Sequence, residues 1–360
     1  MDLQSLLAVI TDLRENSPDN HARWWYDLAP VDQETAVAET PRAVGSLTGL
    51  PGSVLDRALR ATLPQHLEDL TQEKKRVVPT ADPTAIQRVK DKIASLEELS
   101  KVLDEPDRML LGLGVDGERV KAAVAVGDVD SALHVGVYTP GMGSTVHGSI
   151  SRYDDEMDRL RQRAIGMGVD ADTVATVTWL GYEAPLGVND VRKRESAIAG
   201  SRLLRRFTEG MRSPREDRFH LTAIGHSYGS TTTALALLEF EHRIDDAVFF
   251  GSPGLATNDV SALGLPPGHV YLLEARADPV ADLGFFGDDP NQLEQVVILS
   301  TGPSDVGTEI SGHASYLDEG STSQHNIATV VGGVPDLAVH GMVPGFGDRV
   351  RQVIEIFDRD

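Results

Sequence analysis

The sequence predicts an α/β fold with a mostly parallel, doubly wound sheet. Between residues 133 and 300, short apolar segments alternate with longer segments of helical periodicity. Two of these short segments, VATVTWL and DAVFF, are apolar almost throughout, which is typical of strands covered by helices on both faces. The first 105 residues have a helical pattern instead, so a helical segment is expected to precede the sheet.

The helical segment is expected to contain helices at 3–13 and 53–63 and a longer helix that starts at Asp82 and Pro83. Asp82 can cap the free amides, and Pro83 suits the first helical position. Apolar residues then follow at three- and four-residue steps: Ile86, Val89, Ile93, Leu96, Leu99 and Leu103. We expect this stripe to pack on the body of the protein, because it is shorter than the ~3 to 4 heptads that a coiled coil requires.

The periodicity changes from helical to extended near residue 109. Two apolar runs, 109–115 and 118–126, flank Asp116 and Gly117 and predict a β-hairpin. Further strands are expected at 133–138, 173–180, 219–224, 247–250, 270–275 and 296–300, with helices at 153–165, 190–211 and 230–239. We therefore divide the chain into a helical segment, 1–107, packed on an α/β domain, 108–360.

Composition limits the partners. The 55 acidic and 33 basic residues give a net charge of −22, which opposes binding to nucleic acid or to an anionic membrane. The absence of cysteine excludes disulfides, thiolate catalysis and cysteine-based metal sites. The first residues lack a basic leader, and no run approaches the ~18 apolar residues of a membrane span. We expect a cytoplasmic location, with export by a leaderless route still open; the oligomeric state is not readable.

The most informative stretch is FHLTAIGHSYGSTTTALALLEF, in which a strand leads into a helix without a loop. It contains the pattern G-x-S-x-G at Gly225, Ser227 and Gly229. A serine on so sharp a turn is strained, and close packing requires residues without a Cβ on both sides. Ser227 is therefore the expected nucleophile of an α/β-hydrolase fold. A phosphate-binding loop is disfavoured, because Gly-Lys-Ser/Thr is absent and the G-x-G spacing of a dinucleotide site is not in the first strand-to-helix turn.

In this fold the acid and the histidine follow the nucleophile, on loops at the carboxyl ends of later strands. Asp278 comes directly after the strand HVYLLEA and could orient an imidazole through its Nδ1–H. Asp282 lies one helical turn further on, and the pair Asp245 and Asp246 precedes its strand, at the wrong end of the sheet. A helix cap or turn before Pro279 stays open as the alternative role of Asp278.

Of the 11 histidines, His313, His325 and His340 follow this acid. His313 lies in a glycine-containing loop after the last predicted strand, and we prefer it as the general base. His325, which could start a helix, and His340, in a later loop, remain alternatives. His226, inside the turn, is expected to be structural, with its side chain pointing away from the pocket.

Two backbone amides are expected to form the oxyanion hole. One is that of Tyr228, at the N-terminus of the helix after the nucleophile. The other should come from the loop VYTPGMGST, where glycines let the backbone turn its amides inward: Met142 is the first choice and Gly143 the second, an ordinary glycine turn being the alternative. The side chains of Met142 and 285–286 could line an acyl pocket or belong to the core. The chemistry requires no metal or cofactor.

Several motifs extend this interpretation: WWYDLAP, VGSLTGLPGSVLDRA, VTWLGYEAP, GHSYGS, FFGSPG, ARADPVADLG and GHASYL. With them the chain resembles an actinobacterial α/β-hydrolase family that is catalogued as a domain of unknown function. The resemblance implies Ser227, Asp278 and His313 as nucleophile, acid and histidine, and a helical N-terminal part that belongs with the hydrolase. Leu59 departs from the asparagine expected there. The resemblance supplies no substrate.

The predicted function is that of a serine hydrolase. A carboxylic ester hydrolase of esterase or lipase type, acting on a small-molecule or lipid ester through a Ser-His-Asp triad and an acyl-enzyme, is the first hypothesis. An amidase, peptidase or acyltransferase uses the same residues and differs only in contacts that the sequence does not display. A non-catalytic binding or secretion-associated protein of the same fold is the hypothesis from another class.

Overall fold

A computed structural model describes residues 3–191, 193–215, 218–239, 243–281 and 285–341. Within these ranges one sheet has the strand order β1-β2-β4-β3-β5-β6-β7-β8. Strand β2 pairs antiparallel with β1 and β4, and the other neighbours are parallel. The strands are β1 Arg108–Gly114, β2 Lys121–Val126, β3 His134–Thr139, β4 Val174–Leu180, β5 His220–His226, β6 Asp246–Phe250, β7 Val270–Leu273 and β8 Val297–Ile298.

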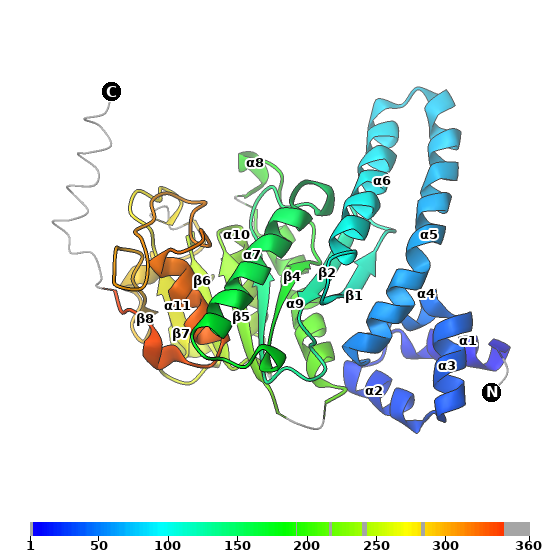
Figure 1. The fold of residues 1–360 in the computed structure, drawn as a ribbon. Helices are drawn as coiled ribbons and strands as arrows, with labels where there is room; N and C mark the ends of the chain where they lie inside the picture. The colour runs from blue at the N-terminus through cyan, green and yellow to red at the C-terminus, as the bar shows by residue number, and fades with distance from the viewer. Residues whose placement is uncertain (1–2, 192, 216–217, 240–242, 282–284, 342–360) are drawn as a thin grey trace.

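Helices cover both faces of the sheet (Figure 1). On one face lie α7 (Val146–Gly166) and α11 (Thr322–Val331), and on the other α9 (Glu195–Arg212) and α10 (Tyr228–Leu237), with the short α8 (Val188–Val191) preceding α9. Residues along β6 alternate between the two cores, because neighbouring strand residues point to opposite faces: Val248 and Phe250 join one, Ala247 and Phe249 the other. The predicted doubly wound architecture is confirmed.

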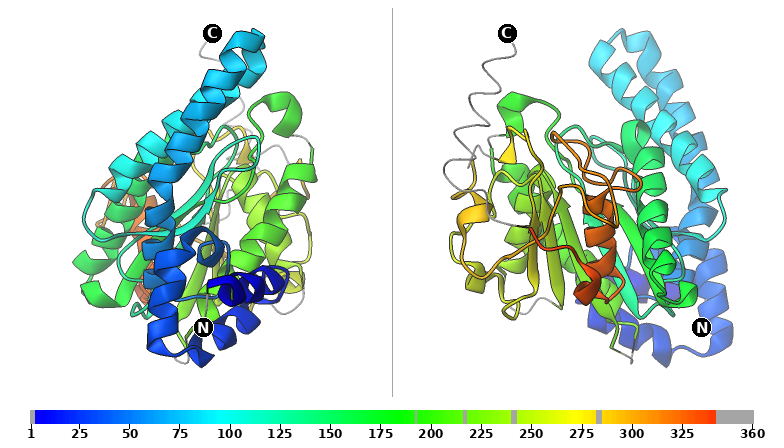
Figure 2. Two further views of the ribbon diagram at one scale, coloured as in Figure 1. Left: turned by 90° about the vertical axis from the view of Figure 1, so that its right-hand side faces the viewer. Right: turned by 60° about the vertical axis from the view of Figure 1, so that its left-hand side comes forward.

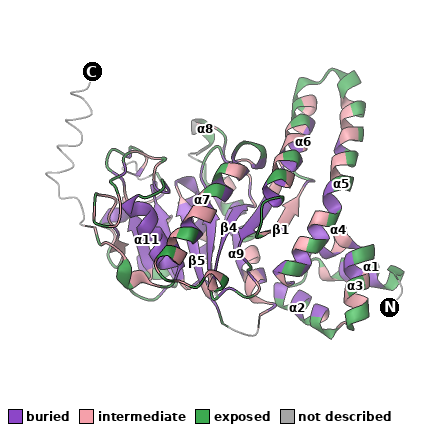
Figure 3. Ribbon diagram, in the orientation of Figure 1, coloured by how far each residue is buried: buried purple, intermediate pink, exposed green. Residues whose placement is uncertain are grey.

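The N-terminal segment is helical, as predicted. Its helices are α1 Leu3–Leu13, α2 Pro18–Asp27, α3 Pro30–Glu39, α4 Pro41–Val44, α5 Gly52–Val77 and α6 Pro83–Leu103. Helices α5 and α6 form a hairpin that projects beyond the sheet (Figures 1 and 2), buried near its base and exposed at its tip (Figure 3). Asp82 caps α6 as expected, accepting from the amides of Thr84 at 2.9 Å and Ala85 at 3.2 Å. The apolar stripe of α6 packs on the body of the protein.

The largest differences from the expected helix boundaries are at the end of α5 and at the start of α7. Helix α5 continues to Val77, past the predicted end at 63, and contains Pro64 in its interior. Leu67 and Leu70 extend its apolar face into the core, and this packing outweighs the hydrogen bond lost at proline. Helix α7 begins before the predicted 153, because the Thr145 side chain caps it by accepting from the Gly148 amide at 3.1 Å.

The change of periodicity falls between the end of α6 at Leu103 and the start of β1 at Arg108. The helical segment and the sheet nevertheless share one core: Leu59 of α5 and Leu99 of α6 belong to the same cluster as Val124 of β2. A division into domains at residue 107 therefore stays a prediction. None of the described helices is both long enough and apolar enough to cross a membrane.

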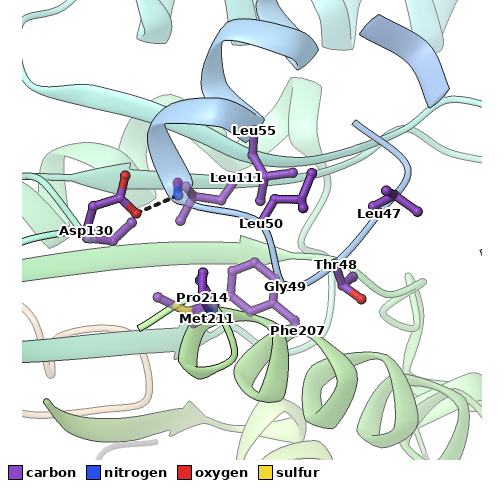
Figure 4. Close-up of a pocket in the computed structure, with 13 residues that line it drawn as sticks. Leu47, Thr48, Gly49, Leu50, Leu55, Leu111, Asp130, Phe207, Met211 and Pro214 are labelled. Atoms are coloured by element: carbon purple, nitrogen blue, oxygen red, sulfur yellow. Dashed lines mark hydrogen bonds between the residues drawn. The ribbon is translucent and has the colours of Figure 1, made fainter. Parts of the chain in front are cut away.

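A carboxylate of the α/β part caps a helix of the N-terminal segment (Figure 4). Helix α5 follows Pro51, which offers no capping side chain. Asp130, between β2 and β3, accepts from the amides of Gly52 at 2.6 Å and Ser53 at 2.8 Å instead. The approach is close, since a Cβ on Gly52 would lie 2.5 Å from the Val129 side chain. A negative charge at a helix N-terminus is stabilising, so Asp130 holds the two parts together.

We expect Asp130→Ala to lower the free energy of unfolding by about 1–2 kcal/mol, the usual cost of losing a helix cap. Asp130→Asn should lose less, because its amide oxygen still accepts one hydrogen bond. Urea denaturation followed by circular dichroism measures both. Glu97→Ala, on the exposed side of α6, is the control and should stay within about 0.5 kcal/mol of the wild type. An Asp130→Ala midpoint equal to that of the control would contradict the capping role.

Candidate active site

Ser227 stands at the turn between β5 and α10 in a strained conformation. Its φ is 54° and its ψ is −130°, a region that non-glycine residues rarely adopt. Its amide donates to the carbonyl of Phe250 on the neighbouring strand at 3.1 Å. The hydroxyl therefore lies at the carboxyl edge of the central strands, where the G-x-S-x-G pattern places it.

Three glycines make room for this turn. A Cβ on Gly225 would lie 2.6 Å from the Ser230 Cα, and one on Gly229 would lie 2.1 Å from the Thr139 carbonyl oxygen. A Cβ on Gly141, in the loop after β3, would lie 2.7 Å from the Cβ of Ser227. Each distance is too short for any side chain. The turn is thus enclosed by its own helix and by the loop that follows β3.

Ser227, His313 and Asp278 form one hydrogen-bonded chain. His313 Nε2 lies 2.8 Å from Ser227 Oγ, and His313 Nδ1 lies 2.9 and 3.0 Å from the Asp278 carboxylate oxygens. A carboxylate only accepts, so Nδ1 carries the proton and Nε2 is the acceptor for the serine hydroxyl. This arrangement can remove a proton from the hydroxyl as the oxygen attacks a carbonyl. The three residues that the sequence nominates are brought together.

Asp278 is buried, 2% exposed, and fully hydrogen-bonded. Besides His313, it accepts from Tyr316 Oη at 2.7 Å and from the Val280 amide at 2.9 Å. Burial alone would raise the pKa of this carboxyl. The hydrogen bond from His313 and the electrostatic attraction to its ring, together with the hydrogen bonds from Tyr316 and Val280, hold the pKa below its ordinary value. Asp278 is therefore an anion at neutral pH that can orient and stabilise an imidazolium.

Tyr316 and Gly251 contribute to this geometry, and the sequence reasoning missed both. Tyr316 Oη accepts from the Ala275 amide at 2.8 Å while it donates to Asp278, which fixes the acid relative to its strand. Gly251 has φ 55°, and a Cβ there would lie 3.0 Å from Asp278 Oδ2 and 3.1 Å from His313 Nδ1. Two features of the sequence could have indicated these residues: Tyr316 lies three residues after His313, and Gly251 directly follows β6.

The expectation that His226 points away from the pocket is wrong. Its ring centre lies 4.8 Å from that of His313, and it lines the same cavity as Ser227. The physical reason is the period of two along β5, which puts His226 on the same face as Ile224, where the His313 loop packs. Nε2 of His226 donates to the backbone carbonyl of His313 at 2.9 Å. Burial, with the nearby charge of His313, lowers the pKa of His226 to about 3, so its ring is neutral.

The structure leaves two of the three expected oxyanion donors as candidates and excludes the third. Tyr228 is the first residue of α10, so its amide has no acceptor within the helix. Gly141 and Met142 line the cavity beside Ser227, which keeps the Met142 amide as the second candidate. The prediction that the Gly143 amide could be an oxyanion donor is wrong. This amide donates to the carbonyl of Pro185 at 2.8 Å and is therefore not free for an oxyanion.

The alternative acids and bases lie elsewhere or outside the described residues. His325, on α11, contacts Arg163 and the carbonyl of Leu337, and His340 is exposed beside β8. Asp245 and Asp246 stand at the opposite end of the sheet, where they contact residues such as Arg212 and His269. Asp282 is not among the described residues.

The aromatic pair nominated for an acyl pocket does not line the cavity. Phe286 is buried in the core, with its ring 5.7 Å from that of Tyr228, and Phe285 is partly exposed. The cavity at Ser227 measures about 210 Å³, and the Met142 side chain does contribute to it. Its other walls include Tyr138, Phe250 and the helix α7. Among the described residues, no three His, Asp or Glu side chains gather closely enough to hold a metal ion.

Comparisons with known proteins found a matching family, similar sequences and similar solved structures. The sequence pattern of the alpha/beta hydrolase family matches residues 116–287. An uncharacterized protein of Mycobacterium tuberculosis is 36% identical over 223 residues, covering 58% of this chain and 84% of that protein. A second from the same organism is 27% identical over 380 positions, covering 91% of this chain and 57% of that protein. A solved esterase of Pyrobaculum calidifontis is similar with a TM-score of 0.41 and 15% identity, over 76% of this chain and 98% of that one. From the family match and the first relative, the chain belongs to the α/β-hydrolase family.

Proposed function

We propose that the protein is a serine hydrolase that cleaves carboxylic esters, with Ser227 as nucleophile, His313 as general base and Asp278 as the acid that orients it. The observation that carries this proposal is the contact of 2.8 Å between His313 Nε2 and Ser227 Oγ, with Nδ1 held by a buried carboxylate. Esters are favoured over amides because an alkoxide is the better leaving group, so ester cleavage demands less of the same residues.

In the proposed reaction, Ser227 Oγ attacks the ester carbonyl while His313 Nε2 takes its proton. The amides of Tyr228 and Met142 stabilise the oxyanion, and the loss of one such donor typically costs ~10² to 10³ in rate. His313 then protonates the leaving alkoxide, which gives an acyl-enzyme. Water, deprotonated by the same imidazole, releases the acid. Asp278 stays ionised throughout and stabilises the imidazolium.

We further place the chain in the actinobacterial group of unknown function that it resembles, which the two mycobacterial relatives support. The substrate would be a small-molecule or lipid ester. A purely binding protein of the same fold is less favoured, because a strained serine costs ~1–3 kcal/mol and such strain gathers at functional sites. An amidase, peptidase or acyltransferase remains the second candidate within the same chemistry.

Ser227→Ala should abolish labelling by a fluorophosphonate probe and reduce kcat for 4-nitrophenyl butyrate by at least ~10⁴, because the attacking atom is gone. Gel fluorescence and the release of nitrophenolate measure the two effects. Ser315→Ala, in the His313 loop with its hydroxyl donating to Ser311, is the control and should retain labelling. Equal labelling of wild type and Ser227→Ala would remove Ser227 as the nucleophile, and faster cleavage of anilides than of esters with the same acyl group would favour the amidase.

His226→Ala should lower kcat by about 10- to 100-fold with little change in KM, because the His313 loop loses the donor that fixes its backbone, and misplaced groups cost rates of this size. His226→Gln, which can still donate an N–H, should recover part of the loss. Since the pKa of His226 is about 3, its charge does not change between pH 5 and 9. The shape of the pH–rate profile should therefore be the same in wild type and both variants, and a displaced acid limb would contradict the positioning role.

Tyr316→Phe should lower the free energy of unfolding by about 1–3 kcal/mol at pH 7, because an ionised Asp278 loses a donor. The pKa of Asp278 is below its ordinary value of 3.8 in the folded protein. Its carboxylate therefore stabilises the fold above that value, and this contribution is lost as the pH falls through the folded value. The gap between wild type and Tyr316→Phe should narrow as the pH falls from 7 through 3.8 to about 2 in urea titrations. A gap that is constant across this range would show that Tyr316 does not act through the charge of Asp278.

A further inference from the structure

Helix α7 brings two charged side chains to the cavity that contains Ser227. Arg152 and Glu156 both line it, and Arg152 Nη1 donates to Glu156 Oε1 at 2.8 Å. The nearby wall is otherwise aromatic or apolar, with Tyr138, Phe250 and Leu317. A strongly polar feature therefore stands where an ester substrate has to lie.

The guanidinium of Arg152 is held in place but not saturated. Its central carbon lies 4.2 Å from the centre of the Tyr153 ring, so the group is stacked on an aromatic face. Among the described residues, Glu156 is the hydrogen-bond acceptor that it meets, through one nitrogen. The Arg152 side chain is 57% exposed. A stacked guanidinium with a free edge can bind a carboxylate through a pair of parallel hydrogen bonds.

An ordinary surface ion pair does not account for this arrangement. Exposed pairs four residues apart on a helix are worth ~0.3–0.5 kcal/mol. The Glu156 side chain is 14% exposed, and burial raises its pKa although Arg152 opposes the rise. Placing a carboxylate there is thus unfavourable for the fold, and such costs are found at functional sites. Glu156 positions Arg152 and competes with any anionic ligand for it.

We propose that Arg152 is a substrate-binding residue that selects esters whose acyl group ends in a carboxylate. The inference rests on the proposed function and names its substrate class. A cavity of about 210 Å³ has room for a short acyl chain that ends in a carboxylate. The leaving alcohol departs outward, whereas the acyl group stays in the cavity as the acyl-enzyme.

Two nearly isosteric esters test this selection: mono-4-nitrophenyl adipate, which ends in a carboxylate, and 4-nitrophenyl heptanoate, which does not. Wild type should prefer the adipate in kcat/KM. Arg152→Gln should reduce kcat/KM for the adipate by about 10- to 100-fold, mainly through KM, and change that for the heptanoate by less than about threefold. Glu156→Gln should raise kcat/KM for the adipate, because a competing carboxylate is removed. Assays at about 0.15 M salt screen the repulsion of anions by the net charge of −22.

Controls separate this effect from loss of fold and from the position of the charge. Arg159→Gln removes another cation of α7, paired with Asp155 at 3.9 Å and not lining the cavity, and should leave both esters unchanged. Arg152→Lys keeps the charge and should retain part of the preference. The butyrate ester of 4-hydroxybenzoate carries its carboxylate on the leaving group and should not depend on Arg152. Dependence there but not for the adipate would overturn the assignment to the acyl group.

Equal losses for adipate and heptanoate in Arg152→Gln, or a wild type that prefers the heptanoate, would overturn the inference while Ser227-dependent hydrolysis upheld the proposed function. If wild type cleaved neither ester and the fluorophosphonate probe did not label Ser227, the proposed function would fail and the inference with it. The two failures are therefore distinguishable in one set of measurements.

Discussion

Ser227 is held at a positive φ by a turn that has no spare volume on either side. Such a conformation costs ~1–3 kcal/mol and persists only where the surroundings enforce it. Here β5 lies between β3 and β6 in the sheet, and nearly every residue of α10 is buried. The well-packed strand and helix fix the backbone on both sides of the serine. Relaxation of the turn would require either of them to move, so the hydroxyl stays at the sheet edge.

The parallel pairing of the later strands brings the remaining groups to that edge. Ser227 directly follows β5, Gly251 directly follows β6, and Asp278 lies a few residues beyond β7. These strands are parallel, so their carboxyl ends all point the same way. His313 arrives on a longer loop. His226 holds the backbone of this loop and Tyr316 connects it to Asp278. The distances at Ser227 therefore depend on backbone contacts as much as on the side chains of Ser227, His313 and Asp278.

The G-x-S-x-G motif and the order of strands along the chain were enough to nominate Ser227, Asp278 and His313, three side chains that lie within hydrogen-bonding distance of one another. Features that depend on packing between distant segments were not readable. Pro64 signals a helix end, yet α5 continues because its apolar face is covered. A glycine gives its backbone amide the freedom to face the oxyanion, but it also lets the amide face another acceptor. The amide of Gly143 donates to the carbonyl of Pro185, a residue beyond β4. Sequence periodicity gives the face of a helix, but not which cavity that face lines.

Helix α7 links the N-terminal helices to the cavity at Ser227. Its buried Asp154 accepts from Arg108 of β1 at 2.9 Å, with both side chains less than one tenth exposed. Ser151 donates to Glu98 of α6, and Tyr153 shares a hydrogen bond of 2.8 Å with Ser144 in the loop after Met142. Contacts with α6, with β1 and with the loop after β3 thus fix one face of α7, while adjacent positions present Arg152 and Glu156 to the cavity at Ser227. Helix α6 of the N-terminal segment therefore supports the wall that α7 contributes to this cavity.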